Sequence, residues 1–125
     1  MRRMMIGIGI VILLSSSCSP SAEKNQISPA VRYQGNILYI KNTDTVVYDS
    51  VTVEINGTFK KTLPLSIPCG QEIGYELSSF MKDDGERFNI LKYGLRSITI
   101  SCEVSDLRGN QWVKLGRAFY SGKFN

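Results

Sequence analysis

The sequence predicts an all-β fold, a small antiparallel β-sandwich. Apolar and polar residues alternate with period two in several stretches, whereas no stretch carries a long helical stripe of apolar residues. Turn-forming residues separate these short stretches about every 8–12 positions, a spacing typical of sandwiches. One face of each sheet is therefore expected to be buried and the other to face water.

The first strands are expected between residues 37 and 63. Residues 37–40 are a run of β-forming residues that stops at Asn42-Thr43-Asp44. Residues 51–55 alternate between apolar and polar, and Asn56-Gly57 follows at once. Because this pair favours positive φ, it predicts a hairpin whose return strand covers 58–63, with Phe59 as a packing residue.

The later strands follow a bend marked by Pro64, Pro68 and Gly70. Alternation in 73–77 and in 97–104 predicts two half-buried strands, and 111–120 is expected to be the last strand. The apolar positions of these strands give the expected core: Leu38, Ile40, Val51, Val53, Ile55, Ile73, Tyr75, Leu77, Ile98, Ile100 and Val104, with Trp112 or Phe119.

The order of strands and turns resembles that of FxLYD-type modules, poorly characterised domains of the bacterial envelope. The segments that carry this resemblance are ILYIKNTDTVVYDSVTVEING, LSIPCGQEIGYELSSFMKDDGERFN and SITISCEV, within residues 31–104. The resemblance implies an immunoglobulin-like fold and no catalytic residue. One departure is Cys69, which stands in the Pro-x-Gly turn where a small or apolar residue is more usual.

The N-terminus resembles a bacterial lipoprotein signal. Arg2 and Arg3 precede an apolar run over 4–14, which is too short to span a membrane by itself. Three small serines then lead to Cys18, whose thiol would accept the lipid, although Ser15 stands where the lipobox usually has leucine. Lipidation at Cys18 is the favoured interpretation; simple secretion and an uncleaved anchor are the alternatives.

This signal predicts three segments. Residues 1–17 form the cleaved signal, 18–30 are polar and form a flexible tether, and 31–125 form the β-sandwich domain. The protein is then expected outside the cytoplasm in the cell envelope, with the membrane as a partner through the lipid anchor. Ser19 after the lipidated cysteine favours the outer membrane in a Gram-negative host.

The chain offers little for catalysis. It contains no histidine, which excludes a Ser-His-Asp or Cys-His site, and two remaining cysteines cannot complete a zinc site alone. Two carboxylate pairs, Glu72 with Glu76 and Asp83 with Glu86, are expected to be solvated surface. The sequence therefore predicts no enzyme, cofactor or metal site. Without Arg2 and Arg3 of the signal, 13 basic and 11 acidic residues leave a net charge of +2 with interspersed signs, which predicts no nucleic-acid partner.

Cys69 and Cys102 remain as a pair once Cys18 is lipidated. They could form a disulfide in an oxidising compartment. The alternative is that Cys102, on the apolar face of its strand, is a small buried hydrophobe.

Trp112, Phe119 and Tyr120 on the last strand form the candidate interaction surface, because a terminal strand can offer an edge and aromatic side chains favour interfaces. The expected function is a structural or protein-interaction module with an unidentified envelope protein as partner. The alternatives are a glycan or small-ligand binding module that uses surface aromatic residues, and a secreted enzyme inhibitor.

Overall fold

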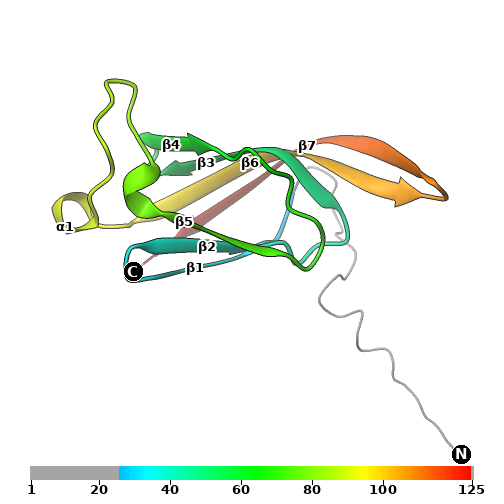
Figure 1. Cartoon of the computed structure of the whole chain (residues 1–125), viewed down its shortest axis with the longest axis horizontal. Coiled ribbons are helices and arrows are strands. Elements are labelled where there is room, and N and C mark those ends of the chain that lie inside the picture. Colours follow the sequence, from blue (N-terminus) through cyan, green and yellow to red (C-terminus); the bar gives the residue numbers. More distant parts are fainter. Residues whose placement is uncertain (1–25, 125) are drawn as a thin grey trace, which may run out of the picture.

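Two antiparallel β-sheets packed face to face make up the computed structural model, which describes residues 26–124 (Figure 1). A three-stranded sheet has the order β1-β2-β5, and a four-stranded sheet has the order β4-β3-β6-β7. The all-β sandwich is thereby confirmed. The elements are β1 (Ala30–Gln34), β2 (Ile37–Lys41), β3 (Val47–Ile55), β4 (Phe59–Thr62), β5 (Glu72–Glu76), the 3-10 helix η2 (Leu77–Ser79), α1 (Ile90–Tyr93), β6 (Ser97–Arg108) and β7 (Gln111–Lys123).

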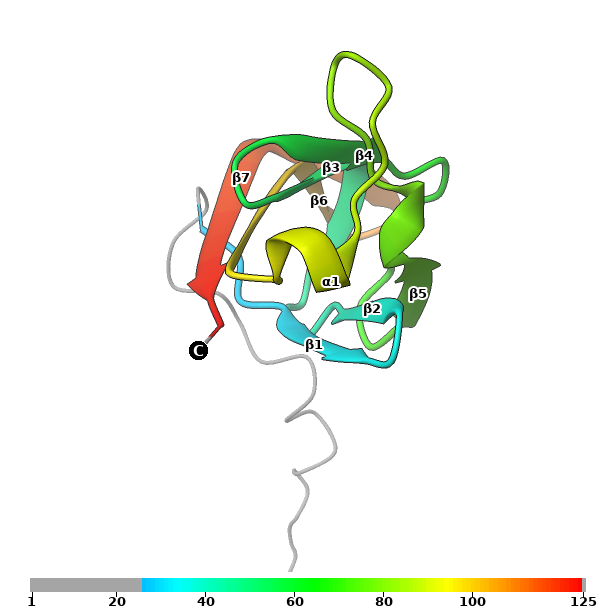
Figure 2. The ribbon, with the colours of Figure 1, turned by 90° about the vertical axis from the view of Figure 1, so that its left-hand side faces the viewer.

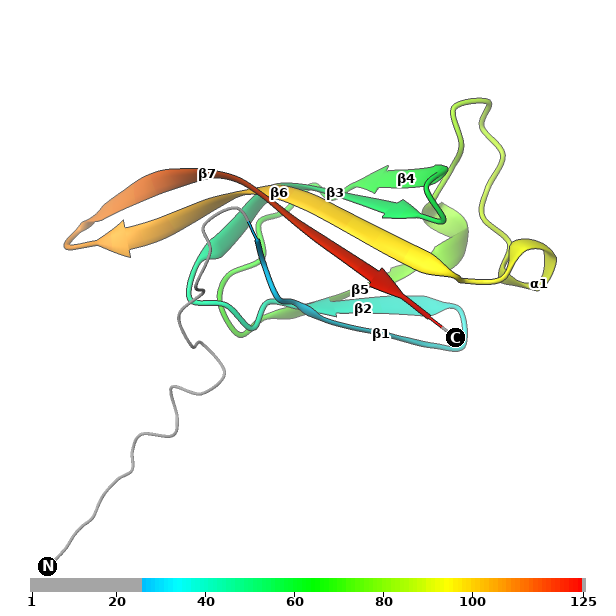
Figure 3. The same cartoon turned by 180° about the vertical axis from the view of Figure 1, so that it is seen from behind.

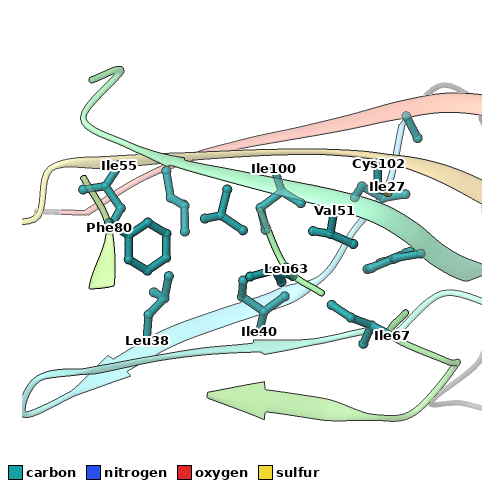
Figure 4. Packing of buried hydrophobic residues seen from close by; sticks show 14 of the residues in the cluster. Ile27, Leu38, Ile40, Val51, Ile55, Leu63, Ile67, Phe80, Ile100 and Cys102 are labelled. Atoms are coloured by element: carbon teal, nitrogen blue, oxygen red, sulfur yellow. The ribbon is translucent and has the colours of Figure 1, made fainter. Parts of the chain in front are cut away.

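The core fills the space between the two sheets (Figure 4). Alternate residues of β3 and β6 face inward, and the register pairs Val53 with Ile100 and Ile55 with Ile98. Leu38 and Ile40 of β2 close the core from the other sheet, each 1% exposed. The period-two pattern of the sequence thus identified the inner faces of these strands correctly.

Other core positions were predicted wrongly. Trp112 and Phe119 are 62% and 52% exposed, and Ile73 and Tyr75 are only partly buried. The largest buried side chains are instead aromatic residues of strand β3 and of loops: Tyr48, Phe80 and Phe88. Loop residues carry no periodicity, so their burial depends on how the loops fold back over the open end of the sandwich.

The β3–β4 hairpin confirms the turn predicted at Asn56-Gly57. Both residues have positive φ, 55° and 73°, and Ile55 pairs with Phe59 across the turn. The Asn56 side chain also accepts hydrogen bonds from the backbone of Arg96 and Ser97 at 2.9 and 3.1 Å. This turn therefore also fixes the start of β6.

A buried polar hub connects the end of β2 to the start of β3. Asn42 is fully buried; its Nδ2 donates to the carbonyls of Val46 and Ile67 at 2.7 and 2.8 Å, and its Oδ1 accepts from the Asp44 amide at 2.9 Å. The Asp44 carboxylate in turn accepts from the Tyr48 hydroxyl. The buried side chains of Asn42, Asp44 and Tyr48 thus each have a hydrogen-bond partner, as burial requires.

The domain begins earlier than the sequence predicted. Ile27 is 4% exposed within the core, and its amide donates to the Phe119 carbonyl at 3.2 Å. The Ser28 amide donates to the Asp44 carboxylate at 2.9 Å. The prediction of a flexible tether up to residue 30 is therefore wrong for 26–30, because one apolar side chain and one buried carboxylate hold this segment. The predictions for residues 1–25 lie outside the described residues.

The two ends of the sandwich differ. At one end the β6–β7 hairpin runs beyond the other strands (Figure 3). At the opposite end α1 lies across the opening between the sheets, with the loop between η2 and α1 above it (Figure 2). Among the described residues, this hairpin therefore extends the four-stranded sheet past the end of the sandwich.

Candidate interaction surface

The β6–β7 hairpin presents two large apolar side chains opposite each other. Leu107 pairs with Trp112, Arg108 pairs with Gln111, and Gly109 takes a φ of 63° in the turn between the strands. Leu107 is 52% exposed and Trp112 is 62% exposed. Because the other strands end before this part of the hairpin, both side chains lie in solvent.

Charged residues continue the same outer face along the hairpin. Glu103 of β6 lies opposite Arg117 of β7, and its carboxylate contacts Arg117 at 3.7 Å and Lys114 at 3.2 Å. Arg117 also donates to the Ser101 hydroxyl at 3.3 Å. These contacts show that Lys114 and Arg117 share one face of the sheet, the face that points away from the core.

The structure brings only two of the three predicted surface residues onto this face. Phe119 lies two positions after Arg117 and pairs with Ser101, so it belongs to the outer face. Tyr120 pairs with the buried Ile100 and packs against the core. Trp112 and Phe119 are therefore exposed on one face, with the basic residues between them, whereas Tyr120 is half-buried on the other.

A shallow hollow of about 360 Å³ adjoins Trp112. Its lining is formed by Val47, Asp49, Ser66, Pro68, Ser105 and Trp112. The Asp49 carboxylate accepts hydrogen bonds from the hydroxyls of Ser105 and Ser66, the former at 3.3 Å. The hollow thus combines apolar walls with one carboxylate that is already bonded.

A β-bulge shapes this hollow. The register between β3 and β6 shifts between Asp49 and Thr52, and Ser50 in the bulge has a φ of 50°. Beyond the end of β4 the chain returns to β3 at Ile67, whose backbone exchanges hydrogen bonds of 2.9 and 3.1 Å with Tyr48. In the loop over 63–66, between β4 and this return, Leu65 is 67% exposed.

The proposed disulfide between Cys69 and Cys102 is not formed. Cys102 is a free cysteine with no exposed surface, on β6 opposite the buried Ala118. Cys69 lies in the turn between Pro68 and Gly70. Burial raises the pKa of the Cys102 thiol to about 12, so the thiol is protonated and apolar at neutral pH. The alternative of a small buried hydrophobe is confirmed.

The carboxylates considered for catalysis serve local structure. Glu86 contacts Lys82 at 2.8 Å and Lys92 at 3.2 Å, and it accepts from the Tyr93 hydroxyl. The hydrogen bond from Lys82, followed by those from Tyr93 and Lys92, lowers the pKa of Glu86 to about 2. A carboxylate that holds its proton so weakly is a poor general acid at neutral pH.

The other carboxylates are dispersed. Glu72 forms an exposed ion pair with Arg32 at 3.2 Å, and Asp84 accepts from the Glu86 amide at 2.9 Å within a turn. Within residues 26–124, no three histidine, cysteine, aspartate or glutamate side chains come together in a way that could hold a metal ion. None of the helices in the same range is long and apolar enough to cross a bilayer.

Comparison with known protein families, with curated proteins and with solved structures finds no match to this chain.

Proposed function

We propose that this chain is a lipid-anchored module of the bacterial cell envelope that acts by contact and not by catalysis. The leader over 1–17, the cysteine at position 18 and the resemblance to FxLYD-type envelope modules support the location. The exposed Leu107–Trp112 pair is the observation that carries the contact role.

The contact role follows from the position of that pair. Exposed apolar residues are common singly, but adjacent large ones indicate a binding surface. Here they lie on a hairpin that projects beyond the core, with Phe119 further along the same face. We name the outer-facing residues Leu107, Trp112 and Lys114 the hairpin tip. An envelope protein is the partner that the sequence leads us to expect for the module as a whole.

The anchor is tested with Cys18→Ser in the native host. The wild type is expected in the membrane fraction with palmitate incorporated, and the variant is expected to lose both while the domain still folds. Ser16→Ala is the matched control and should behave as the wild type. Palmitate labelling that persists in Cys18→Ser would contradict the proposed anchor.

The contact role is tested by photo-crosslinking in the intact envelope. A photoreactive residue at position 107 should give adducts with an envelope component, whereas one at position 91, where Leu91 is 95% exposed at the other end of the sandwich, should not. Equal capture at both positions would mean that the hairpin tip is not a specific surface.

The hollow beside Trp112 supports a second candidate, the binding of a glycan or small ligand. A sugar ring could stack on the indole while its hydroxyls reach Asp49 and Ser66. Titration with peptidoglycan fragments would then change the fluorescence of Trp112, the one tryptophan of the chain. Binding to Trp112→Ala, which has no tryptophan emission, is measured by calorimetry; an affinity equal to that of the wild type would rule out this site.

A further inference from the structure

We infer that the hairpin tip rests on the headgroup layer of the membrane that holds the lipid anchor. This inference depends on the proposed lipidation of Cys18. It adds the identity of the surface that Leu107 and Trp112 meet: phospholipid headgroups at the membrane–water interface.

The first step is the reach of the anchor. Gln26 forms a bridge with Phe119, and the next residue, Ile27, donates its amide to the Phe119 carbonyl, so the N-terminal segment joins the domain on β7 itself. The eight residue steps from Cys18 to Gln26 span at most about 28 Å when extended. The middle of β7 therefore stays within that distance of the lipid attachment point.

The second step is the length of the hairpin. Seven residue steps separate Phe119 from Trp112 along β7, or about 23 Å at the rise of a β-strand. This length is comparable to the reach of the anchor. The strand that receives the tether is thus also the strand that carries the projecting apolar pair, and the hairpin tip lies within reach of the same membrane.

The third step is the chemistry of the hairpin tip. Tryptophan prefers the membrane–water interface, because its ring is apolar while its N–H remains polar. Leu107 adds apolar surface directly opposite. On the same face, the basic Lys114 and Arg117 balance the acidic Glu103 and Asp49. The basic side chains are the more exposed, 75% and 48% against 34% for Glu103, and so are placed to meet headgroup phosphates.

The same features disfavour a second copy of this chain paired along the edge of β7. The pairing of β6 with β7 shifts between Val104 and Ser105, and Gly116 in the irregular part of β7 has a φ of 119°. The N-terminal segment also occupies part of this edge, because Gln26 bridges to Phe119. Bulges and lysines on an edge strand are common means of preventing such pairing.

The experiment places the lipidated full-length protein in vesicles of phosphatidylglycerol and phosphatidylethanolamine. Trp112 is the only tryptophan, so its emission reports on the hairpin tip alone. We expect a blue shift relative to the unlipidated Cys18→Ser protein, and quenching by lipids brominated near the headgroup. Leu107→Glu should lower the docking equilibrium constant, read from the quenching, about tenfold, since burial of half a leucine side chain corresponds to that factor.

Leu91→Glu is the matched control, because it adds the same charge at an exposed leucine far from the hairpin. It should leave the quenching unchanged, and circular dichroism should show that both variants are folded. Trp112 emission that ignores brominated lipid, in protein that still floats with the vesicles, would overturn the inference and leave the anchor intact. Capture of a protein at position 107 without lipid quenching would overturn it equally. Failure to float would refute the proposed anchor instead.

Discussion

Replacement of Asn42 by alanine should remove the polar hub that holds the junction between β2 and β3. The Asn42 side chain makes three hydrogen bonds of 2.7 to 2.9 Å, two as donor and one as acceptor, and it has no exposed surface. Alanine would leave the carbonyls of Val46 and Ile67 and the amide of Asp44 without these partners. The Ile67 carbonyl still accepts from the Tyr48 amide at 3.1 Å, so two groups are orphaned, the Val46 carbonyl and the Asp44 amide. Each orphaned buried group costs about 1–1.5 kcal/mol, which gives a loss of about 2–3 kcal/mol in the free energy of unfolding.

This loss is large for a domain of about 100 residues, whose total stability is of the order of 5–15 kcal/mol. Urea unfolding followed by circular dichroism measures it. With a denaturant dependence of about 1.5 kcal/mol per molar, the unfolding midpoint should fall by about 1.3–2 M. Asn42→Asp should be at least as destabilising, because it loses both donated hydrogen bonds and puts a carboxylate beside the buried Asp44.

The matched control is Asn110→Ala in the exposed turn of the β6–β7 hairpin, where the change should stay within about 0.5 kcal/mol. A loss below about 1 kcal/mol for Asn42→Ala would refute the reasoning. It would mean that water or relaxed backbone satisfies the two orphaned groups as well as the asparagine does.

Three further outcomes are expected. The folded-state pKa of Glu86 lies near 2, below its usual value of 4.5. The contribution of the Glu86 carboxylate to the stability of the folded state is therefore complete above about pH 4.5 and is lost as the pH falls towards 2. Glu86→Gln should lower the melting temperature at pH 7 but not at pH 2. Burial raises the pKa of Cys102 to about 12, so its thiol should resist iodoacetamide at pH 8 until the protein is unfolded. Peptide mass mapping measures this labelling, and a labelled Cys102 in the native protein would contradict its burial. Gly57→Ala should destabilise the domain by about 1 kcal/mol in thermal unfolding, because Gly57 has a φ of 73° that alanine rarely adopts; an unchanged melting temperature would show that the turn adapts.

Local sequence signals identified the strands whose two faces differ. Val51, Val53 and Ile55 alternate with polar residues, and the structure buries all three. The turn at Asn56-Gly57 was equally readable, since positive φ at two successive positions strongly favours these residue types. Both signals depend on a few neighbouring residues, so the sequence alone was sufficient.

The exposure of Trp112 and Phe119 and the state of the Cys102 thiol could be determined only from the tertiary structure. Alternation along β7 shows that Phe119 and Tyr120 point to opposite faces, but not which face meets the other sheet. Trp112 lies on the part of the hairpin that extends beyond the other strands. Its exposure therefore depends on the lengths of several strands, which cannot be read from β7 alone. The choice between disulfide and buried thiol for Cys102 depended on which residues its strand faced across the core.

The polar hub and the N-terminal segment also combine a feature that the sequence predicted with contacts that only the tertiary structure revealed. The sequence marked Asn42 as the end of a strand, because asparagine commonly stops a β run. It could not show that this side chain reaches the carbonyl of Ile67, 25 residues away, or that Ile27 packs beside β7. Contacts between distant segments depend on how the two sheets stack, whereas strand periodicity and turn geometry are properties of neighbouring residues.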